Sequence, residues 1–161
     1  MKNNKTVLIT GATGGLGLSI AEKFYKKNFN MILTGTNESK LELLDSKFTI
    51  NTKIIKCNLA KSEEIIKMFD LIPGEFEGID VLINNAGITK DNLFLRMKEN
   101  DWDEVLNVNL KANFSLCKMV IKSMVKKRWG RIINISSAVA KMGNAGQTNY
   151  AASKAAIEGF T

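Results

Sequence analysis

The chain has 161 residues, 45% of them hydrophobic, and a formal net charge of +7, which fits a globular chain with one core and excludes a disordered or fibrous one. No stretch approaches the roughly 20 apolar residues that cross a bilayer, and the N-terminus lacks the apolar segment of a signal peptide, so we expect a cytoplasmic protein that binds no membrane. The basic residues are scattered, which argues against nucleic acid as a partner.

Short apolar runs alternate with amphipathic stretches along the chain. We expect strands at 6–10, 31–34, 53–56, 81–83 and 131–135. We expect helices at 16–27, 38–48, 62–72 (with Ser62 as N-cap), 101–127 and through 150–156.

Wholly apolar strands separated by helices are typical of a parallel sheet that is buried on both faces. Right-handed crossovers would make this an α/β, doubly wound, three-layer sheet with ligands at the carboxyl ends of its strands. We expect residues 1–161 to form one domain. Cys57 and Cys117 have no metal-binding or CxxC spacing, so we expect free, buried thiols and no metal site.

A glycine-rich turn, TGATGGLG at 10–17, joins the first strand to the first helix. Glycine lets the backbone approach a pyrophosphate closely, and the N–H groups and dipole of a helix N-terminus stabilise its charge. The turn therefore predicts a dinucleotide site, and the alternative is a tight turn that binds nothing. The residues expected at this site are Gly11, Thr13, Gly14, Gly15, Leu16 and Gly17.

The residues after the second strand bear on which dinucleotide is preferred. An acidic residue at the strand end would bind a ribose 2′-hydroxyl and repel a 2′-phosphate. Thr36 stands there, and Glu38 comes only two positions later. This favours NADP over NAD, although no arginine is nearby, Gly14 has no side chain and Lys40 is the available cation.

The sequence NNAG at 84–87 follows the fourth strand. One interpretation is a turn held by asparagine side chains. The other is a set of small residues past which the riboses of a dinucleotide lie, and both can hold together.

Tyr150 and Lys154 share one face if they lie on a helix. An ammonium beside a phenol favours the phenolate, so the pair suits proton transfer. Ser137, after the last apolar run, can donate a hydrogen bond to a carbonyl oxygen. A serine hydrolase is disfavoured because the chain has no histidine, and the alternative is a helix start with a lysine that extends to solvent.

Together, TGxxxGxG at 10–17, NNAG at 84–87, Ser137 and Tyr150-x-x-x-Lys154 resemble the short-chain dehydrogenase/reductase family, whose fold is of the Rossmann type. The stretch 84–161 is similar to the bacterial 3-oxoacyl-[acyl-carrier-protein] reductases. The resemblance covers the whole chain and implies NADPH-dependent reduction of a 3-oxoacyl thioester on acyl carrier protein in fatty acid biosynthesis.

The resemblance also implies roles for single residues. Tyr150 would donate the proton, Ser137 would orient the carbonyl, Lys154 would assist Tyr150 and bind the nicotinamide ribose, and Asn109 would position a water for proton relay. Thr36 would meet the 2′-phosphate, and Arg128, in the basic cluster 126–128, would contact the acidic carrier protein. Further cofactor contacts would come from Asn58, Leu59, Asn85, Ala86 and Gly87.

Members of the family continue beyond the position of Thr161, so the resemblance implies that the last strands of the fold are absent and that the chain is C-terminally truncated. It also implies a homotetramer, with the helices from Asp101 and after Tyr150 between subunits. Two alternatives stay open: a reductase of an acyl-CoA or another small ketone, and a truncated nucleotide-binding protein without catalysis.

Overall fold

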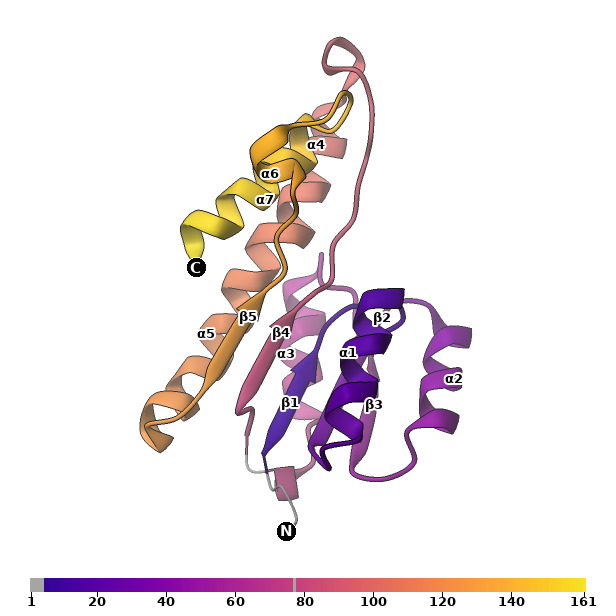
Figure 1. Cartoon of the computed structure of the whole chain (residues 1–161), viewed down its shortest axis with the longest axis vertical. Coiled ribbons are helices and arrows are strands. Elements are labelled where there is room, and N and C mark those ends of the chain that lie inside the picture. Colours follow the sequence, from indigo (N-terminus) through magenta and orange to yellow (C-terminus); the bar gives the residue numbers. More distant parts are fainter. Residues whose placement is uncertain (1–4, 77) are drawn as a thin grey trace.

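The computed structural model describes residues 5–76 and 78–161, which form a five-stranded parallel sheet with the strand order β3-β2-β1-β4-β5 (Figure 1). The strands are β1 (Thr6–Ile9), β2 (Asn30–Gly35), β3 (Thr52–Lys56), β4 (Val81–Asn84) and β5 (Arg131–Asn134). β1 lies in the middle of the sheet, with β2 and then β3 on one side of it and β4 and then β5 on the other. This confirms the predicted doubly wound α/β architecture.

Helices connect the strands. They are α1 (Gly15–Tyr25), α2 (Glu38–Lys47), α3 (Ser62–Asp70), α4 (Glu99–Leu106), α5 (Ala112–Lys127), α6 (Val139–Met142) and α7 (Thr148–Phe160), with short 3₁₀ turns at Gly74–Phe76 and Phe94–Arg96. Within the described chain, no helix is long and apolar enough to span a bilayer.

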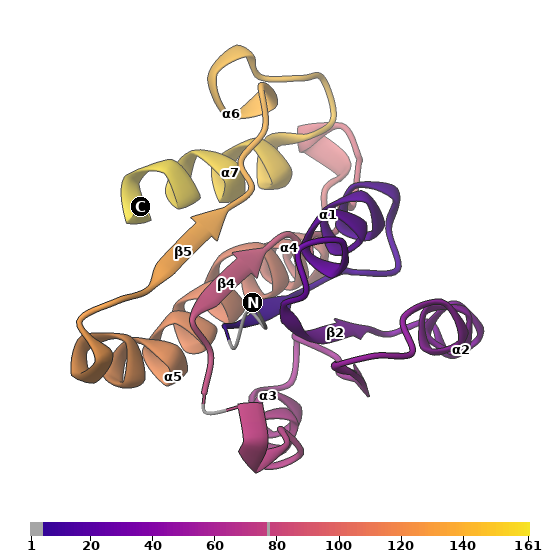
Figure 2. The ribbon, with the colours of Figure 1, turned by 60° about the horizontal axis from the view of Figure 1, so that its bottom comes forward.

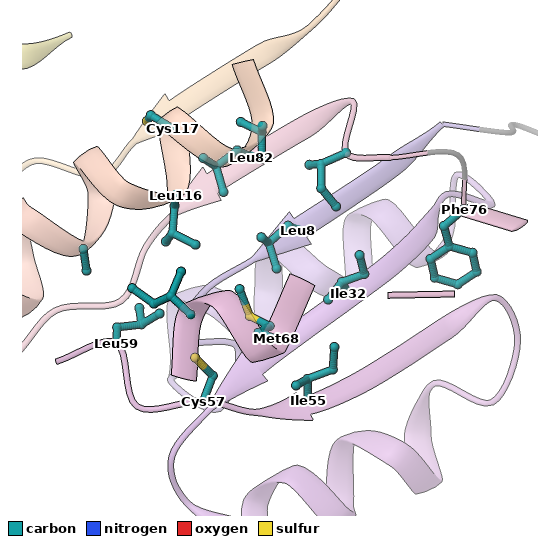
Figure 3. Packing of buried hydrophobic residues seen from close by; sticks show 14 of the residues in the cluster. Leu8, Ile32, Ile55, Cys57, Leu59, Met68, Phe76, Leu82, Leu116 and Cys117 are labelled. Atoms are coloured by element: carbon teal, nitrogen blue, oxygen red, sulfur yellow. The ribbon is translucent and has the colours of Figure 1, made fainter. Parts of the chain in front are cut away.

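Alternate residues of the central strands point into two separate hydrophobic clusters, one on each face of the sheet. On one face, Leu8 and Ile32 pack with residues of α3 and α5, such as Met68 and Leu116 (Figure 3). Figure 2 shows the ribbons of α3 and α5 on the same side of the sheet. On the other face, residues including Val7, Ile9, Met31 and Leu33 pack with α1 and α2. Both faces are covered, which explains why the strands are apolar throughout rather than alternating.

Cys57 and Cys117 are free and buried, as predicted, and both belong to the cluster beneath α3 and α5 (Figure 3). In this environment they pack as small apolar side chains.

Two predicted helices differ in detail from the structure. Ser62 is the first residue of α3 rather than its cap, which is Lys61 in an extended conformation. The helix expected from 101 to 127 contains a π-helical segment, Asn107–Lys111, between α4 and α5. An amphipathic pattern does not reveal such an insertion, because the π-helical segment is only five residues long and is too short to show a period of its own.

Candidate functional site

A cavity of about 650 Å³ opens along the carboxyl ends of β1 to β4. All of the predicted cofactor residues other than Tyr150 and Lys154 line it: Gly11, Thr13, Gly14, Gly15, Leu16, Gly17, Thr36, Asn58, Leu59, Asn85, Ala86 and Gly87. Residues that the sequence did not single out also line it, namely Thr34, Gly35, Cys57, Ala60, Ile88, Glu104 and Val108. Ile88 directly follows NNAG and Val108 directly precedes Asn109, so both could have been found from those positions, whereas Glu104 lies on α4 outside any motif.

The glycine-rich turn has the shape that a dinucleotide pyrophosphate requires. In the described structure no side chain caps the N-terminus of α1, so the N–H groups of its first turn can donate hydrogen bonds to a phosphate. Gly11 has φ +63°, and a Cβ there would lie 2.9 Å from the Cα of Ala86. A Cβ on Gly17 would lie 2.3 Å from the carbonyl oxygen of Gly11. The residues present therefore fit such a cofactor.

Side chains at the ends of β1 and β4 hold the two turns together. The Thr10 hydroxyl accepts the N–H groups of Asn85 and Ala86, both at 3.0 Å. The Asn85 amide donates to the carbonyls of Thr10 and Gly11 at 2.9 and 3.1 Å. Asn85 thus has the turn-holding role that we considered, and it also lines the cavity.

The corner after β2 exposes Thr36 beside an ion pair. Asn37 caps α2 by accepting the N–H of Lys40, and the carboxylate of Glu38 pairs with Lys56 Nζ at 3.0 Å. Lys56 lies on β3 and was not anticipated as part of this corner. Its ammonium offsets the charge of the only acidic residue in the turn 35–38.

The first two turns of α7 carry Tyr150 and Lys154. The Lys154 ammonium lies 5.7 Å from the centre of the Tyr150 ring and donates to the carbonyl of Ile135 at 2.7 Å. Lys154 is 3% exposed, and burial lowers the pKa of its ammonium. The alternative of a lysine that extends to solvent is therefore excluded.

Several contacts attach α7 to the chain that carries Ser137. Besides the bond from Lys154 to Ile135, the Ser136 hydroxyl donates to Glu158 at 2.8 Å and Asn134 donates to Thr161 at 3.0 Å. The Ser137 hydroxyl accepts the N–H of Val139 at 3.3 Å, at the start of α6. Its hydrogen remains available for another acceptor.

Gly87, which lines the cavity, lies close to Asn109 and Lys154. A Cβ on Gly87 would lie 3.3 Å from Asn109 Oδ1 and 3.6 Å from Lys154 Nζ. The Asn109 amide accepts the N–H of Ile88 at 2.8 Å and donates to the Ile88 carbonyl and the Ser153 hydroxyl, both at 3.0 Å. The structure therefore brings Asn109 and Lys154 together at the wall of the cavity.

The predicted basic cluster lies elsewhere. Arg128 is exposed and ends α5 in a left-handed conformation, φ 52°, whereas Lys127 pairs with Asp80 at 2.9 Å. The cluster precedes β5 and Ser137 follows it, so Arg128 and Ser137 lie at opposite ends of that strand.

The chain matches one family model and several curated relatives. The family model for short chain dehydrogenase matches residues 5–161. Three curated relatives, each called 3-oxoacyl-[acyl-carrier-protein] reductase FabG, come from Rickettsia typhi (50% identical), Vibrio cholerae (46%) and Aquifex aeolicus (45%), with 98% of this chain covered in each case. The chain spans 64% of the length of the first two relatives and 65% of the third.

Proposed function

Because the chain belongs to the short-chain dehydrogenase family, we propose that it binds NADPH and takes part in the reduction of a 3-oxoacyl group on acyl carrier protein to the 3-hydroxyacyl group. The names of its relatives support the substrate. The structural observation that carries the proposal is the position of Lys154 Nζ, which lies close to Gly87 in the wall of the cofactor cavity. The proposal treats residues 1–161 as one cofactor-binding domain.

Ser137 and Tyr150 have distinct tasks in this reaction. NADPH, when bound, supplies the hydride that reaches the keto carbon. The Ser137 hydroxyl donates to the keto oxygen, which holds the carbonyl in place and stabilises its growing negative charge. Tyr150 gives its phenolic proton to that oxygen, so the ketone gains one hydride and one proton and becomes an alcohol.

Lys154 and Asn109 support the proton donor. The Lys154 ammonium lies near the Tyr150 ring and favours the phenolate that remains after proton transfer. Every polar group of the Asn109 side chain is engaged with Ile88 or Ser153, and its carbonyl accepts the amide of Asn113 at 3.0 Å. The Asn109 side chain is thus used to hold Ile88 and Ser153 in place, and its role in positioning a relay water stays a proposal drawn from the resemblance.

The turn after β2, which contains Thr36 and Glu38, fits NADP better than NAD. Thr36 offers a hydroxyl to a 2′-phosphate, and the pairing of Glu38 with Lys56 reduces the repulsion that a lone carboxylate would exert. Lys40 adds a second exposed ammonium on the first turn of α2.

Carrier protein and subunit partners form the remaining part of the proposal. Arg128 suits an acidic carrier, but a carrier docked there must span β5 to deliver its acyl group to the same chain's Ser137. Exposed apolar residues on α5, among them Phe114, Ile121 and Val125, support packing between subunits in a homotetramer. The cytoplasmic location inferred from the sequence stays a prediction.

A comparison of thioesters tests the substrate. We expect faster NADPH consumption with acetoacetyl groups on carrier protein than on coenzyme A, and Arg128→Glu should slow the carrier reaction while leaving the coenzyme A reaction unchanged. A clear preference for coenzyme A would replace the carrier with an acyl-CoA or another small ketone. NADPH binding without consumption of either thioester would favour a nucleotide-binding protein without catalysis.

A further inference from the structure

Asn149, directly before Tyr150, is a polar side chain with no exposed surface. Its Oδ1 accepts the N–H of Tyr150 at 2.8 Å. Its Nδ2 donates to the carbonyls of Lys90 and Asp101 at 3.0 and 3.3 Å. These three bonds use both donors of the amide and occupy its acceptor.

The bonds of Asn149 join parts of the chain that are far apart in sequence. Lys90 belongs to the segment that leaves β4 through Gly87 and Ile88, and Asp101 lies in the first turn of α4. Asn149 therefore attaches the start of α7 to the chain that continues from the wall of the cofactor cavity.

A second buried link lies one turn further along α7. Ser153, also without exposed surface, accepts from the Asn109 amide at 3.0 Å and donates to the Tyr150 carbonyl at 2.7 Å. Asn109 in turn holds both polar groups of the Ile88 backbone. The N–H and the carbonyl of Tyr150 are thus each bonded to a buried side chain that is connected to the segment 88–90.

An apolar residue at 149 would leave the Tyr150 N–H and two carbonyls to find other partners, so the site is built for an amide. Asn149 does not line the cofactor cavity, and it acts through Tyr150. We propose that Asn149 is a positioning residue, which fixes the Tyr150 phenol relative to the cavity wall at Gly87 and Ile88. The inference rests on the proposed function in so far as Tyr150 is the proton donor.

The chain offers a direct probe, because Tyr25 and Tyr150 are its only tyrosines. Protein labelled with 3-fluorotyrosine gives one ¹⁹F signal for each, and Tyr25→Phe assigns them. In Asn149→Ala and Asn149→Asp we expect the Tyr150 signal to shift or broaden while the Tyr25 signal stays in place. The matched control is Asn144→Ala, an exposed asparagine of the same connection whose amide contacts Gln147 at 2.9 Å; it should change neither signal.

Turnover gives the second measurement. We expect Asn149→Ala to lower kcat on the order of 10- to 100-fold, as small displacements of a reacting group do, with NADPH affinity and the KM for the thioester close to those of the unchanged protein. Asn149→Asp keeps the acceptor for the Tyr150 N–H but directs a carboxylate at two carbonyl oxygens. A similar loss in Asn149→Asp would identify the bonds to Lys90 and Asp101 as the ones that matter.

Several results would overturn the inference. A Tyr150 signal and a kcat that stay unchanged, with only a lower unfolding temperature, would reduce Asn149 to a structural role, as would a failure of both variants to fold. If the unchanged protein consumes no NADPH, the proposed function fails, yet a Tyr150 signal that moves in the variants still supports the positioning role.

Discussion

The Lys154 ammonium is nearly enclosed, and its hydrogen bond to the Ile135 carbonyl partly offsets the loss of water around it. Burial lowers the pKa of this ammonium. Burial disfavours the charged form, so the Lys154 ammonium releases its proton at a lower pH than a lysine in solvent does. The same bond fixes Lys154 to the chain that leads to Ser137.

The ion pair between Lys56 and Glu38 should affect how strongly the protein prefers NADPH over NADH. In Lys56→Ala the Glu38 carboxylate loses its partner, so its repulsion of a 2′-phosphate grows. We expect the preference for NADPH over NADH, measured as a ratio of dissociation constants by fluorescence titration, to fall by up to about fivefold, the range of an exposed pair. Lys53→Ala, an exposed lysine on the same strand, is the control. An equal fall in both variants would refute the specific role of Lys56.

The raised pKa of the Cys57 thiol should make the stability of the protein depend on pH in the alkaline range. Burial raises the pKa of this thiol from 9.0 to about 11. The unfolded chain therefore releases the proton at lower pH than the folded one, and ionisation favours unfolding as pH rises between these values. Urea unfolding at pH 9 and pH 11 should show a smaller loss of stability in Cys57→Ala than in the unchanged protein. Parallel losses would mean that Cys57 does not contribute, because the lysines are the same in both.

At the scale of elements, the turn between β1 and α1 packs backbone against backbone. A Cβ on Gly17 would lie 2.3 Å from the Gly11 carbonyl and 2.9 Å from the Cα of Ala12. We expect Gly17→Ala to cost about 1–3 kcal/mol of unfolding free energy, as overpacking does, and to weaken NADPH binding. Gly159→Ala, in α7, meets no atom of the described chain within 4 Å and should be neutral or stabilising. Equal stability of the two variants would contradict the packing described for this turn.

The helix α5 is buried on one side and exposed on the other. Leu116 has no exposed surface and packs beneath the sheet, whereas Ile121 is 50% exposed. We expect Leu116→Ala to cost about 2–5 kcal/mol in chemical denaturation, because it leaves a cavity. Ile121→Ala should cost much less. A comparable cost at both positions would indicate that Ile121 is buried in an assembly of subunits.

The sequence predicted the strands because each is an apolar run between turn residues. It also predicted many of the residues that line the cavity, because they directly follow strands. The bonds of Asn149 could not be predicted. Lys90 and Asp101 lie 59 and 48 residues away in sequence, and nothing local marks such partners. The pairing of Lys56 with Glu38 escaped for the same reason, because the two residues lie on different elements, 18 residues apart in sequence.

At the scale of the whole molecule, one edge of the sheet collects the proposed chemistry. The glycine-rich turn, NNAG and Ser137 follow β1, β4 and β5, and α7 is attached to this edge through Lys154, Asn149 and Ser153. The edge holds both the cavity proposed for the cofactor and Tyr150, the proposed proton donor, which is the arrangement that a reductase requires. Because the chain spans 64% of the length of its first two relatives, its activity is the point to measure.

The most direct test follows NADPH absorbance after acetoacetyl-acyl carrier protein is added to the protein. The account predicts that NADPH is consumed in step with 3-hydroxyacyl product, and that Tyr150→Phe, which lacks the proton donor, lowers the rate on the order of 10²- to 10⁴-fold while binding NADPH with unchanged affinity. Tyr25→Phe should react like the unchanged protein. The central claim would be contradicted if NADPH is consumed equally fast with and without the Tyr150 hydroxyl, or is bound and never consumed.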